Sequence, residues 1–242
     1  MRAPLALACA ALLALLCSGC APEWKWRYAP DPPTSRLPLL DNTVAVPNLS
    51  DERPPNKEQN VALHLLLVFV PGVLYQTNEV ERPEQIPGNE MQFHPTEDVA
   101  RALADEITNR RLFKATVYSP AGSQGDLILR GRLSSTHGEM TIYQYGLNGV
   151  GVYTWFLGIP AGTSKRQLTF TLQLEEPQSE SILWQKSYKT ERSTTEGLYY
   201  GTPAGHIVFD SMLKELMPQI LADLEQAIKG MTTAAAGGSR GP

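Results

Sequence analysis

Residues able to carry catalysis or bind a metal are few in this sequence and widely separated. Its four histidines lie far apart, and no two of them have the spacing of metal ligands; they are His64, His94, His137 and His206. His137 and Glu139 form one close pair, which a strand would place on one face, where it could act in acid–base chemistry or supply half of a metal site. A solvated strand end explains the pair more simply. We therefore expect no catalytic residue, no metal site and no cofactor.

Nucleotide-binding motifs and basic segments are missing as well. The sequence has no P-loop and no G-x-G-x-x-G, and the glycine-rich stretch that begins at Gly146 lacks both a lysine and a following helical pattern. The formal net charge is −4, without a basic block or a basic helix face. These features exclude nucleic acid as a partner and predict a protein that is not an enzyme.

The cysteines predict a location. All three, Cys9, Cys17 and Cys20, lie in the first twenty residues, and residues 1–19 have the basic start, apolar centre and small-residue end of a secretory signal peptide. The ending LLCSGC resembles the lipobox of bacterial lipoproteins, although Cys17 stands where leucine is usual. This resemblance implies lipidation of Cys20, while cleavage near Ala21 by an ordinary signal peptidase is the alternative. If the enteric sorting rule applies, Ala21 favours the outer membrane, facing the periplasm.

The remaining chain divides into three parts. Residues 20–40 contain five prolines and predict an extended, hydrated tether. Its aromatic residues Trp24, Trp26 and Tyr28 have two open interpretations, docking onto the domain or a belt at the membrane interface. Residues 41–229 form the expected domain, and residues 230–242 are small and polar, which predicts a disordered tail.

Apolar periodicity within the domain predicts its fold class. A helix starts near Thr96 as its cap, and a second starts near Pro203 with Thr202 as its cap. Residues 61–71 favour a buried strand, with a buried helix as the alternative, and residues 77–93 a polar loop. Further strands are expected at 43–47, 112–119, 126–137 and 166–176, the last with a hairpin partner at 179–191 and with an apolar face of Leu168, Phe170, Leu172 and Leu174. The expected apolar stripe of the first helix is Val99, Leu103 and Ile107, and that of the second is Phe209, Leu213, Leu216, Leu221, Leu224 and Ile228. We therefore predict an α+β fold with a mostly antiparallel four- to six-stranded sheet and two main helices packed on one face.

Several stretches together resemble a family of uncharacterised bacterial envelope lipoproteins. They include VAVPNLSDERP, ERPEQIP, ARALADEITNRRLFK, LILRGRLSST, ILWQKSY and GLYYG. The expected layout is also similar, in topology alone, to the small domains of the curli-secretion lipoprotein, the TolB N-terminal domain and the lipoprotein activators of penicillin-binding proteins. The resemblance implies a scaffold or partner-binding role without catalysis.

One long uncharged run suggests a contact surface. Met140 to Ser164 is 25 residues without a charged side chain, but its five glycines and Pro160 rule out a membrane-spanning helix. We expect residues 146–162 to form a compact, glycine-jointed loop or hairpin. The domain core, a partner protein and a bilayer are the three candidates to cover its apolar side chains, and the expected contact residues are Tyr153, Trp155, Phe156, Leu157 and Ile159.

These observations favour a lipid-anchored envelope lipoprotein that acts as a non-catalytic scaffold or as an assembly or transport accessory. Its expected partners are the membrane, through the N-terminal lipid, and an envelope protein. A periplasmic module that binds a lipid or other amphiphile is one alternative, and a hydrolase is another, which would need clustered polar groups.

Overall fold

The structure is a computed structural model that describes residues 26–57, 72–85, 93–122, 125–147, 150–200 and 207–237. Within these ranges the chain is α+β, with one eight-stranded mixed sheet, three α-helices and a short 3-10 helix. In chain order the elements are β1 Leu40–Val46, β2 Ser50–Asp51, β3 Tyr75–Val80, η1 Pro83–Gln85, α3 Pro95–Arg110, β4 Phe113–Tyr118, β5 Leu127–Ser135, β6 Gly138–Tyr143, α4 Gly151–Trp155, β7 Gly162–Glu176, β8 Ser181–Glu196 and α5 Ile207–Gly237.

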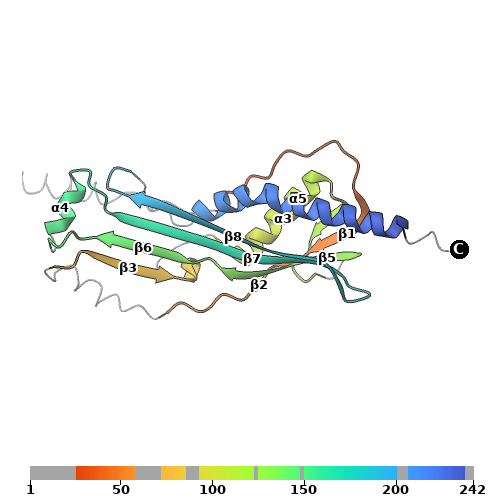
Figure 1. Cartoon of the computed structure of the whole chain (residues 1–242), viewed down its shortest axis with the longest axis horizontal. Helices are drawn as coiled ribbons and strands as arrows, with labels where there is room; N and C mark the ends of the chain where they lie inside the picture. The colour runs from red at the N-terminus through yellow and green to blue at the C-terminus, as the bar shows by residue number, and fades with distance from the viewer. Residues whose placement is uncertain are drawn as a thin grey trace, which may run out of the picture.

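A long hairpin forms the spine of the molecule (Figure 1). β7 and β8 pair antiparallel along almost their whole length, from Gly162 opposite Glu196 to Glu176 opposite Ser181. At the rise of an extended strand, fifteen residues of β7 span about 50 Å. Along the other edge of β7, β5 and β6 follow one another end to end, so three antiparallel strands connect the two ends of the fold.

The two ends of this spine differ in what surrounds them. At the core end, β1 pairs parallel with both β4 and β5, and α3 and α5 cover the sheet. At the distal end, β3 pairs antiparallel with β6, and α4 lies beyond the strand ends (Figure 1).

The sheet therefore differs from the predicted one. It has eight strands and is mixed, whereas the sequence favoured four to six mostly antiparallel strands. The parallel pairs arise because the chain returns through α3 before it forms β4 beside β1. The run Tyr75–Val80, interpreted as part of a polar loop from residue 77 onward, is a strand because its backbone pairs with β6.

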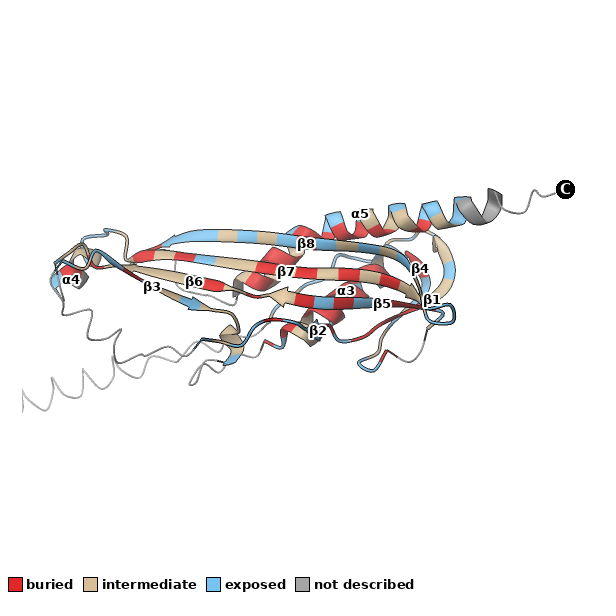
Figure 2. Cartoon of the chain, turned by 60° about the horizontal axis from the view of Figure 1, so that its bottom comes forward, coloured by how far each residue is buried: buried red, intermediate tan, exposed pale blue. Residues whose placement is uncertain are grey.

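The core confirms the predicted faces of β7 and of both helices. Leu168, Phe170, Leu172 and Leu174 are at most 1% exposed, while the intervening threonines are only partly covered. They pack with α3 and α5 in one cluster, and Figure 2 shows the buried residues of α5 on the side toward the sheet. The buried stripe of α5 is the predicted one: Phe209, Leu213, Leu216, Leu221, Leu224 and Ile228.

Helix boundaries required corrections. α3 starts at Pro95 with His94 as its N-cap residue, so Thr96 lies inside the helix and does not cap it. The backbone N–H of His94 donates a hydrogen bond to the Asp98 carboxylate at 2.7 Å. α5 continues to Gly237, past the predicted domain end at residue 229, and the alanines near its end have the highest helix propensity. The expected strand at residues 61–71 and the expected cap at Thr202–Pro203 lie outside the described residues.

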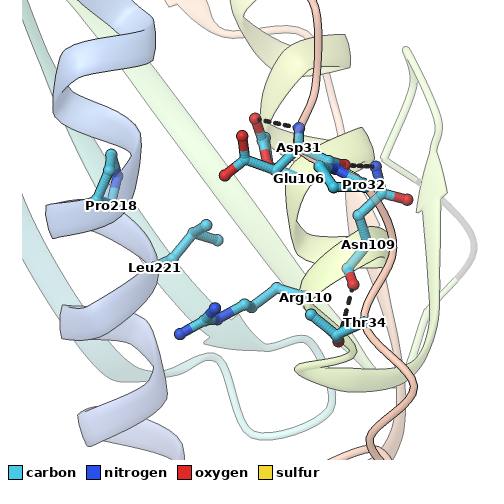
Figure 3. A pocket seen from close by; sticks show the side chains of 8 residues that line it. All are labelled: Asp31, Pro32, Thr34, Glu106, Asn109, Arg110, Pro218 and Leu221. Atoms are coloured by element: carbon cyan, nitrogen blue, oxygen red, sulfur yellow. Dashed lines mark hydrogen bonds between the residues drawn. The ribbon is translucent and has the colours of Figure 1, made fainter.

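The supposed tether is docked from Trp26 onward. Residues 26–40, which we term the strap, lie along α3 and α5 (Figure 3). Trp26 stacks on Phe93 with ring centroids 5.1 Å apart, and Phe93 stacks on Phe209, the third residue of α5. Docking is therefore the correct interpretation for Trp26 and for Tyr28, which also packs on the core. Trp24, the lipidation candidate Cys20 and residues 1–19 lie outside the described residues.

A buried carboxylate holds the strap in place. The Glu106 side chain on α3 is 1% exposed and accepts hydrogen bonds from the Tyr28 hydroxyl (2.6 Å), the Asp31 backbone N–H (3.1 Å) and Lys214 Nζ (2.7 Å). Burial, and then the hydrogen bond to Glu106, raise the pKa of Tyr28 above its ordinary value. Because a buried carboxylate is stable only when paired, the proline-rich strap completes the core rather than extending from it.

We expect Phe170→Ala to lower the free energy of unfolding by about 3–5 kcal/mol, because the side chain is fully buried between the sheet and the helices. Thr171→Ala, on the opposite face of the same strand, is the matched control and should cost less than about 1 kcal/mol. Urea unfolding of both variants measures the difference. Equal losses would contradict the described packing.

Candidate contact surface at the distal tip

Segments from three regions of the sequence meet at the distal end. The backbone N–H groups of Tyr145 and Gly146 donate to carbonyl oxygens at Leu74 and Val73. The hydroxyls of Tyr199 and Tyr200 donate to carbonyls of the α4 region, those of Phe156 and Gly158, at 3.2 and 3.1 Å. We call the resulting unit, residues 72–75, 144–147, 150–161 and 197–200, the distal tip.

The distal tip concentrates exposed apolar surface. Fifteen large hydrophobic side chains are exposed among the described residues, and eleven of them belong to the tip. They are Leu74, Tyr75, Leu147, Val150, Tyr153, Phe156, Leu157, Ile159, Leu198, Tyr199 and Tyr200. Single exposed hydrophobic residues are normal on protein surfaces, but a cluster of this kind marks an interaction surface.

Glycines shape the tip, as the sequence predicted. Gly146 and Gly158 have φ of 71° and 80°, values that L side chains rarely adopt, and they flank α4. A Cβ on Gly151 would lie 2.2 Å from the carbonyl oxygen of Gln144, so only glycine lets α4 pack this closely. The described part of residues 146–162 is thus a turn, a five-residue helix and a second turn between β6 and β7.

Four of the five predicted contact residues are exposed at the tip. Leu157 is 80% exposed, Tyr153 69% and Phe156 57%, and Ile159 is exposed as well. Trp155 differs, because its side chain is half-buried and its indole N–H donates to the Tyr143 carbonyl at 3.2 Å. Trp155 therefore supports the tip from below, and whether the other four contact a partner stays a prediction.

The tip is uncharged. Its described segments contain no acidic or basic side chain, and the nearest charges in sequence are Glu79, Glu139, Lys165 and Glu196 on the strands behind it. In the parts of the chain that the structure describes, no helix combines the length and apolar character needed to cross a membrane.

A cavity of about 310 Å³ lies beneath the tip. Met140 and Ile142 on β6, Trp155 on α4 and Leu198 after β8 contribute its apolar walls. Glu196 is its acidic residue and is only 6% exposed, and burial raises the pKa of this carboxyl group. The cavity is thus mostly apolar with one polar position.

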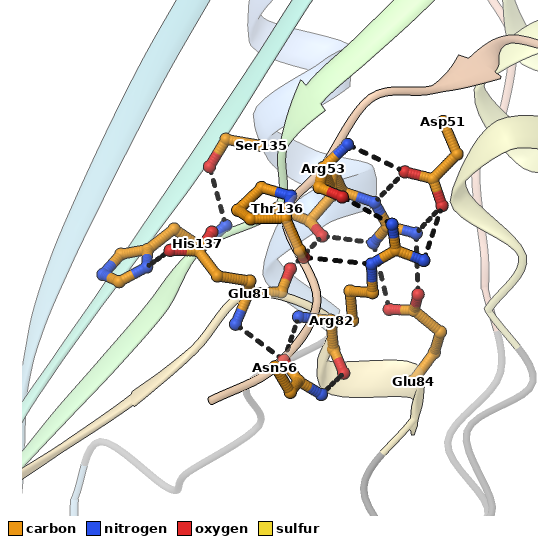
Figure 4. A network of polar contacts seen from close by, with 10 residues as sticks. Asp51, Arg53, Asn56, Glu81, Arg82, Glu84, Ser135, Thr136 and His137 are labelled. Carbon is orange, nitrogen blue, oxygen red and sulfur yellow. Dashed lines mark hydrogen bonds and ion pairs between the residues drawn. The ribbon is translucent and has the colours of Figure 1, made fainter. Parts of the chain in front are cut away.

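A buried arginine connects the distal end to the core (Figure 4). The Arg53 side chain, 2% exposed, binds both carboxylate oxygens of Asp51 at 2.9 Å and those of Glu84 at 2.7 and 3.2 Å. Its Nη1 also donates to the Thr136 hydroxyl at 2.6 Å. Arg82 joins this cluster through an ion pair with Asp51 at 3.2 Å.

The residues of this cluster lie in stretches that carry the family resemblance, but no role was predicted for them. Its two arginines come from two Glu-Arg-Pro tripeptides, residues 52–54 and 81–83. Thr136 stands between β5 and β6, Asp51 belongs to β2, and Glu84 follows β3. The repeated tripeptide was the available signal, but nothing in it indicated that the two copies meet.

His137 and Glu139 lie at one cavity, and each has a different charged neighbour. His137 Nδ1 lies 2.9 Å from Glu81, and Glu139 pairs with Lys165 at 3.4 Å. Both line a cavity of about 510 Å³ together with Arg192 and Glu191. Among the described residues, no three histidine, cysteine or acidic side chains are grouped as a metal site. His94 caps α3, and His64 and His206 lie outside the described residues.

Comparisons with known proteins give weak structural likenesses. No protein-family model and no curated protein matches the chain. A Xanthomonas campestris protein of the DUF330 family is similar in structure, with a TM-score of 0.45 and 10% identity over 86% of this chain and 98% of that one. A candidate lipoprotein from Caulobacter crescentus has a TM-score of 0.33 and 12% identity over 55% and 81% of the two chains.

A third similar structure is a candidate homologue of the neuraminyllactose-binding haemagglutinin from Helicobacter pylori. Its TM-score is 0.33, with 9% identity over 85% of this chain and 99% of that one. The similar structures thus include a DUF330 protein and a candidate lipoprotein. The looser resemblance to the curli-secretion, TolB and penicillin-binding-protein-activator domains is not confirmed by them.

Replacing Arg53 should destabilise the protein strongly. We expect Arg53→Met to lower the free energy of unfolding by about 3 kcal/mol, because Glu84 then loses its ion pair with Arg53 and Asp51 keeps only its ion pair with Arg82. Arg132→Met is the matched control, since Arg132 forms an exposed pair with Glu52 at 4.0 Å and should contribute less than about 1 kcal/mol. Chemical denaturation measures both variants. A loss of stability in Arg53→Met as small as that in Arg132→Met would contradict the stabilising role of the Arg53 cluster.

Acid should remove part of the stabilisation that Arg53 provides. The hydrogen bond from Arg53 holds the pKa of Asp51 below its ordinary value. A carboxyl group with a lowered folded-state pKa stabilises the fold above its unfolded pKa of about 3.9, and loses that effect as the pH falls through the folded value. The stability difference between wild type and Arg53→Met should therefore shrink below about pH 4. A difference that stays constant down to pH 2 in denaturation curves would count against the pairing.

Proposed function

We propose that this protein is a lipid-anchored accessory protein of the cell envelope that works by contact through its distal tip, without catalysis. The observation that carries the proposal is the gathering of eleven exposed large apolar side chains on one uncharged tip. Leaving a side chain of this size in water forfeits about 1.5–3 kcal/mol of burial free energy. A surface retained at that cost has a use in binding.

The tip is presented rigidly. β3, β6, β7 and β8 lead to it as a continuous hydrogen-bonded ribbon, and the Arg53 cluster fixes the ribbon to the core. Rigid presentation lowers the ordering cost of binding, which favours contact through a defined surface. An envelope protein and a bilayer are both suitable occupants for a surface of this composition.

Lipidation of Cys20 supplies the location in this proposal. Five residues separate Cys20 from Trp26, where the docked strap begins, so the lipid would hold the domain close to its membrane. Ala21 after the lipidated cysteine favours the outer membrane, with the domain in the periplasm. Two or three acyl chains are sufficient for stable anchoring.

The absence of catalysis is part of the same proposal. The ring nitrogen Nδ1 of His137 and the carboxylate of Glu139 each have a charged neighbour at hydrogen-bond or ion-pair distance, which leaves neither poised on a shared reacting atom. A hydrolase would need a nucleophile or bound water between such groups.

A second candidate function is amphiphile binding in the cavity beneath the tip. Its volume of about 310 Å³ is at the lower end of the range for small-molecule sites. The apolar walls suit an acyl chain or an aromatic group, and Glu196 suits a hydroxyl or amine donor on the ligand. Filling the cavity through Ala161→Leu would reduce such binding while leaving the exposed tip residues in place.

The contact role predicts that the tip is dispensable for folding. The triple variant Tyr153→Ser, Phe156→Ser, Leu157→Ser should leave the melting temperature nearly unchanged, because all three side chains are exposed. In intact envelopes, a photocrosslinking amino acid placed at Ile159 should form an adduct with a protein or a lipid in the wild type and lose it in the triple variant.

Ile182→Ser with Leu183→Ser provides the control, because these two exposed residues lie at the other end of the hairpin. This control should keep the adduct. A large drop in melting temperature on changing the tip would show that the tip belongs to the folding core, and the absence of any adduct in the wild type would reject the contact role.

A further inference from the structure

We infer that the distal tip enters the lipid bilayer of the same membrane that holds Cys20, as a second attachment beside the lipid. The inference rests on the proposed lipid anchor and contact surface, and it assigns the occupant of that surface. Three independent features of the described residues support it: the position of the N-terminal end of the strap, the internal hydrogen bonds of four tip hydroxyl groups, and the lack of charge at the tip.

The N-terminal end of the strap lies on the side of the core that faces the tip. Trp26 stacks on Phe93, which stacks on Phe209 at the start of α5. Figure 1 shows that α5 starts toward α4 and runs away from it, so the C-terminal end of α5 is the part of the core farthest from the tip. The chain therefore enters the fold on the tip side.

Covalent reach limits how far the lipid can lie from Trp26 and how far the start of α5 can lie from the tip. An extended chain spans at most about 3.6 Å per residue. The six residues from Cys20 to Trp26 therefore place the lipid within about 22 Å of Trp26, and the seven residues from Tyr200 to Ile207 keep the start of α5 within about 25 Å of the tip. These limits are compatible with both attachments lying on one membrane surface.

Four hydroxyl groups of the tip are hydrogen-bonded internally, which lowers the cost of moving them into an apolar environment. Tyr145 donates its hydroxyl to the Pro160 carbonyl at 2.5 Å, and Thr154 donates to the Gly151 carbonyl at 2.6 Å. The hydroxyls of Tyr199 and Tyr200 are likewise bonded to backbone carbonyls. These hydroxyl groups can therefore leave water while keeping their hydrogen bonds. The rings of Tyr199 and Tyr200 are exposed and can contact lipid.

The composition of the tip also fits a bilayer better than a protein interface. Protein interfaces surround their apolar centre with a polar rim and are enriched in arginine, whereas the described tip segments carry no charge. Tyrosines prefer the headgroup region, and leucine and phenylalanine suit the acyl chains. Phe156 and Leu157, directly after α4, would enter deepest, and Tyr75, Tyr199 and Tyr200 would lie at the interface.

A thiol-directed label tests the inference on the lipoprotein itself. The mature chain has a single cysteine, and the lipid occupies it, so Leu157→Cys provides one reactive thiol for an environment-sensitive fluorophore. Ile182→Cys, at the opposite end of the hairpin, is the matched control. Both labelled lipoproteins would be reconstituted into phosphatidylcholine vesicles that contain a lipid with a quencher on its acyl chain.

We expect the label at residue 157 to emit as in an apolar medium and to be quenched, with no change between low and high salt because the tip is uncharged. The label at residue 182 should remain in water. In the unlipidated mature chain carrying Cys20→Ser, Phe156→Ser should weaken vesicle binding by about tenfold or more.

The outcomes separate this inference from the function on which it rests. A label at residue 157 that stays in water while the lipid retains the protein on the vesicle overturns the inference. If the tip then crosslinks to a protein in native envelopes, contact through the tip still stands. Failure of the wild-type protein to remain on vesicles overturns the lipid anchor and the inference together.

Discussion

The Arg53 guanidinium is the interaction on which the arrangement of the two ends depends. It lies where β5 passes into β6, and its nitrogens bind Asp51 from the core, Glu84 from the segment after β3, and Thr136 between the two strands. A planar guanidinium with five donors can hold several acceptors at fixed angles, which a lysine cannot do. α3 and α5 pack on β1, β4, β7 and β8, so the Arg53 cluster, together with the pairing of β6 with β7, joins the distal ribbon to the core.

The sequence predicted those parts of the fold whose burial follows a local period. β7 alternates apolar and polar residues, and α3 and α5 carry apolar stripes, so their faces could be assigned before the structure was known. β2 and β3 escaped prediction because they are held by backbone pairing and have no apolar alternation. The docking of the strap was not predicted, because its main contact joins Tyr28 to Glu106, 78 residues apart. Local composition indicated only a proline-rich spacer.

The sequence predicted only part of the candidate site, because only some of its residues belong to one local pattern. An uncharged run of 25 residues is visible in the sequence, and it located α4 and its exposed apolar side chains. The contributions of Leu74, Tyr75 and residues 197–200 depend on long-range hydrogen bonds that no local pattern encodes. Trp155 was expected to be exposed like its neighbours. Successive side chains of a helix point in different directions, however, and the indole N–H of Trp155 donates to the Tyr143 carbonyl.

The strap gives the fold a particular response to mechanical load. It runs along the helices from Phe209, near the start of α5, to Glu225, further along the same helix, which Arg36 contacts at 3.2 Å. A force transmitted from a membrane through the N-terminus pulls this segment along its length. The contacts at Tyr28, Thr34 and Arg36 are then strained together in shear instead of being peeled apart one after another. A docked proline-rich segment of this kind would keep tension on the N-terminus away from the sheet.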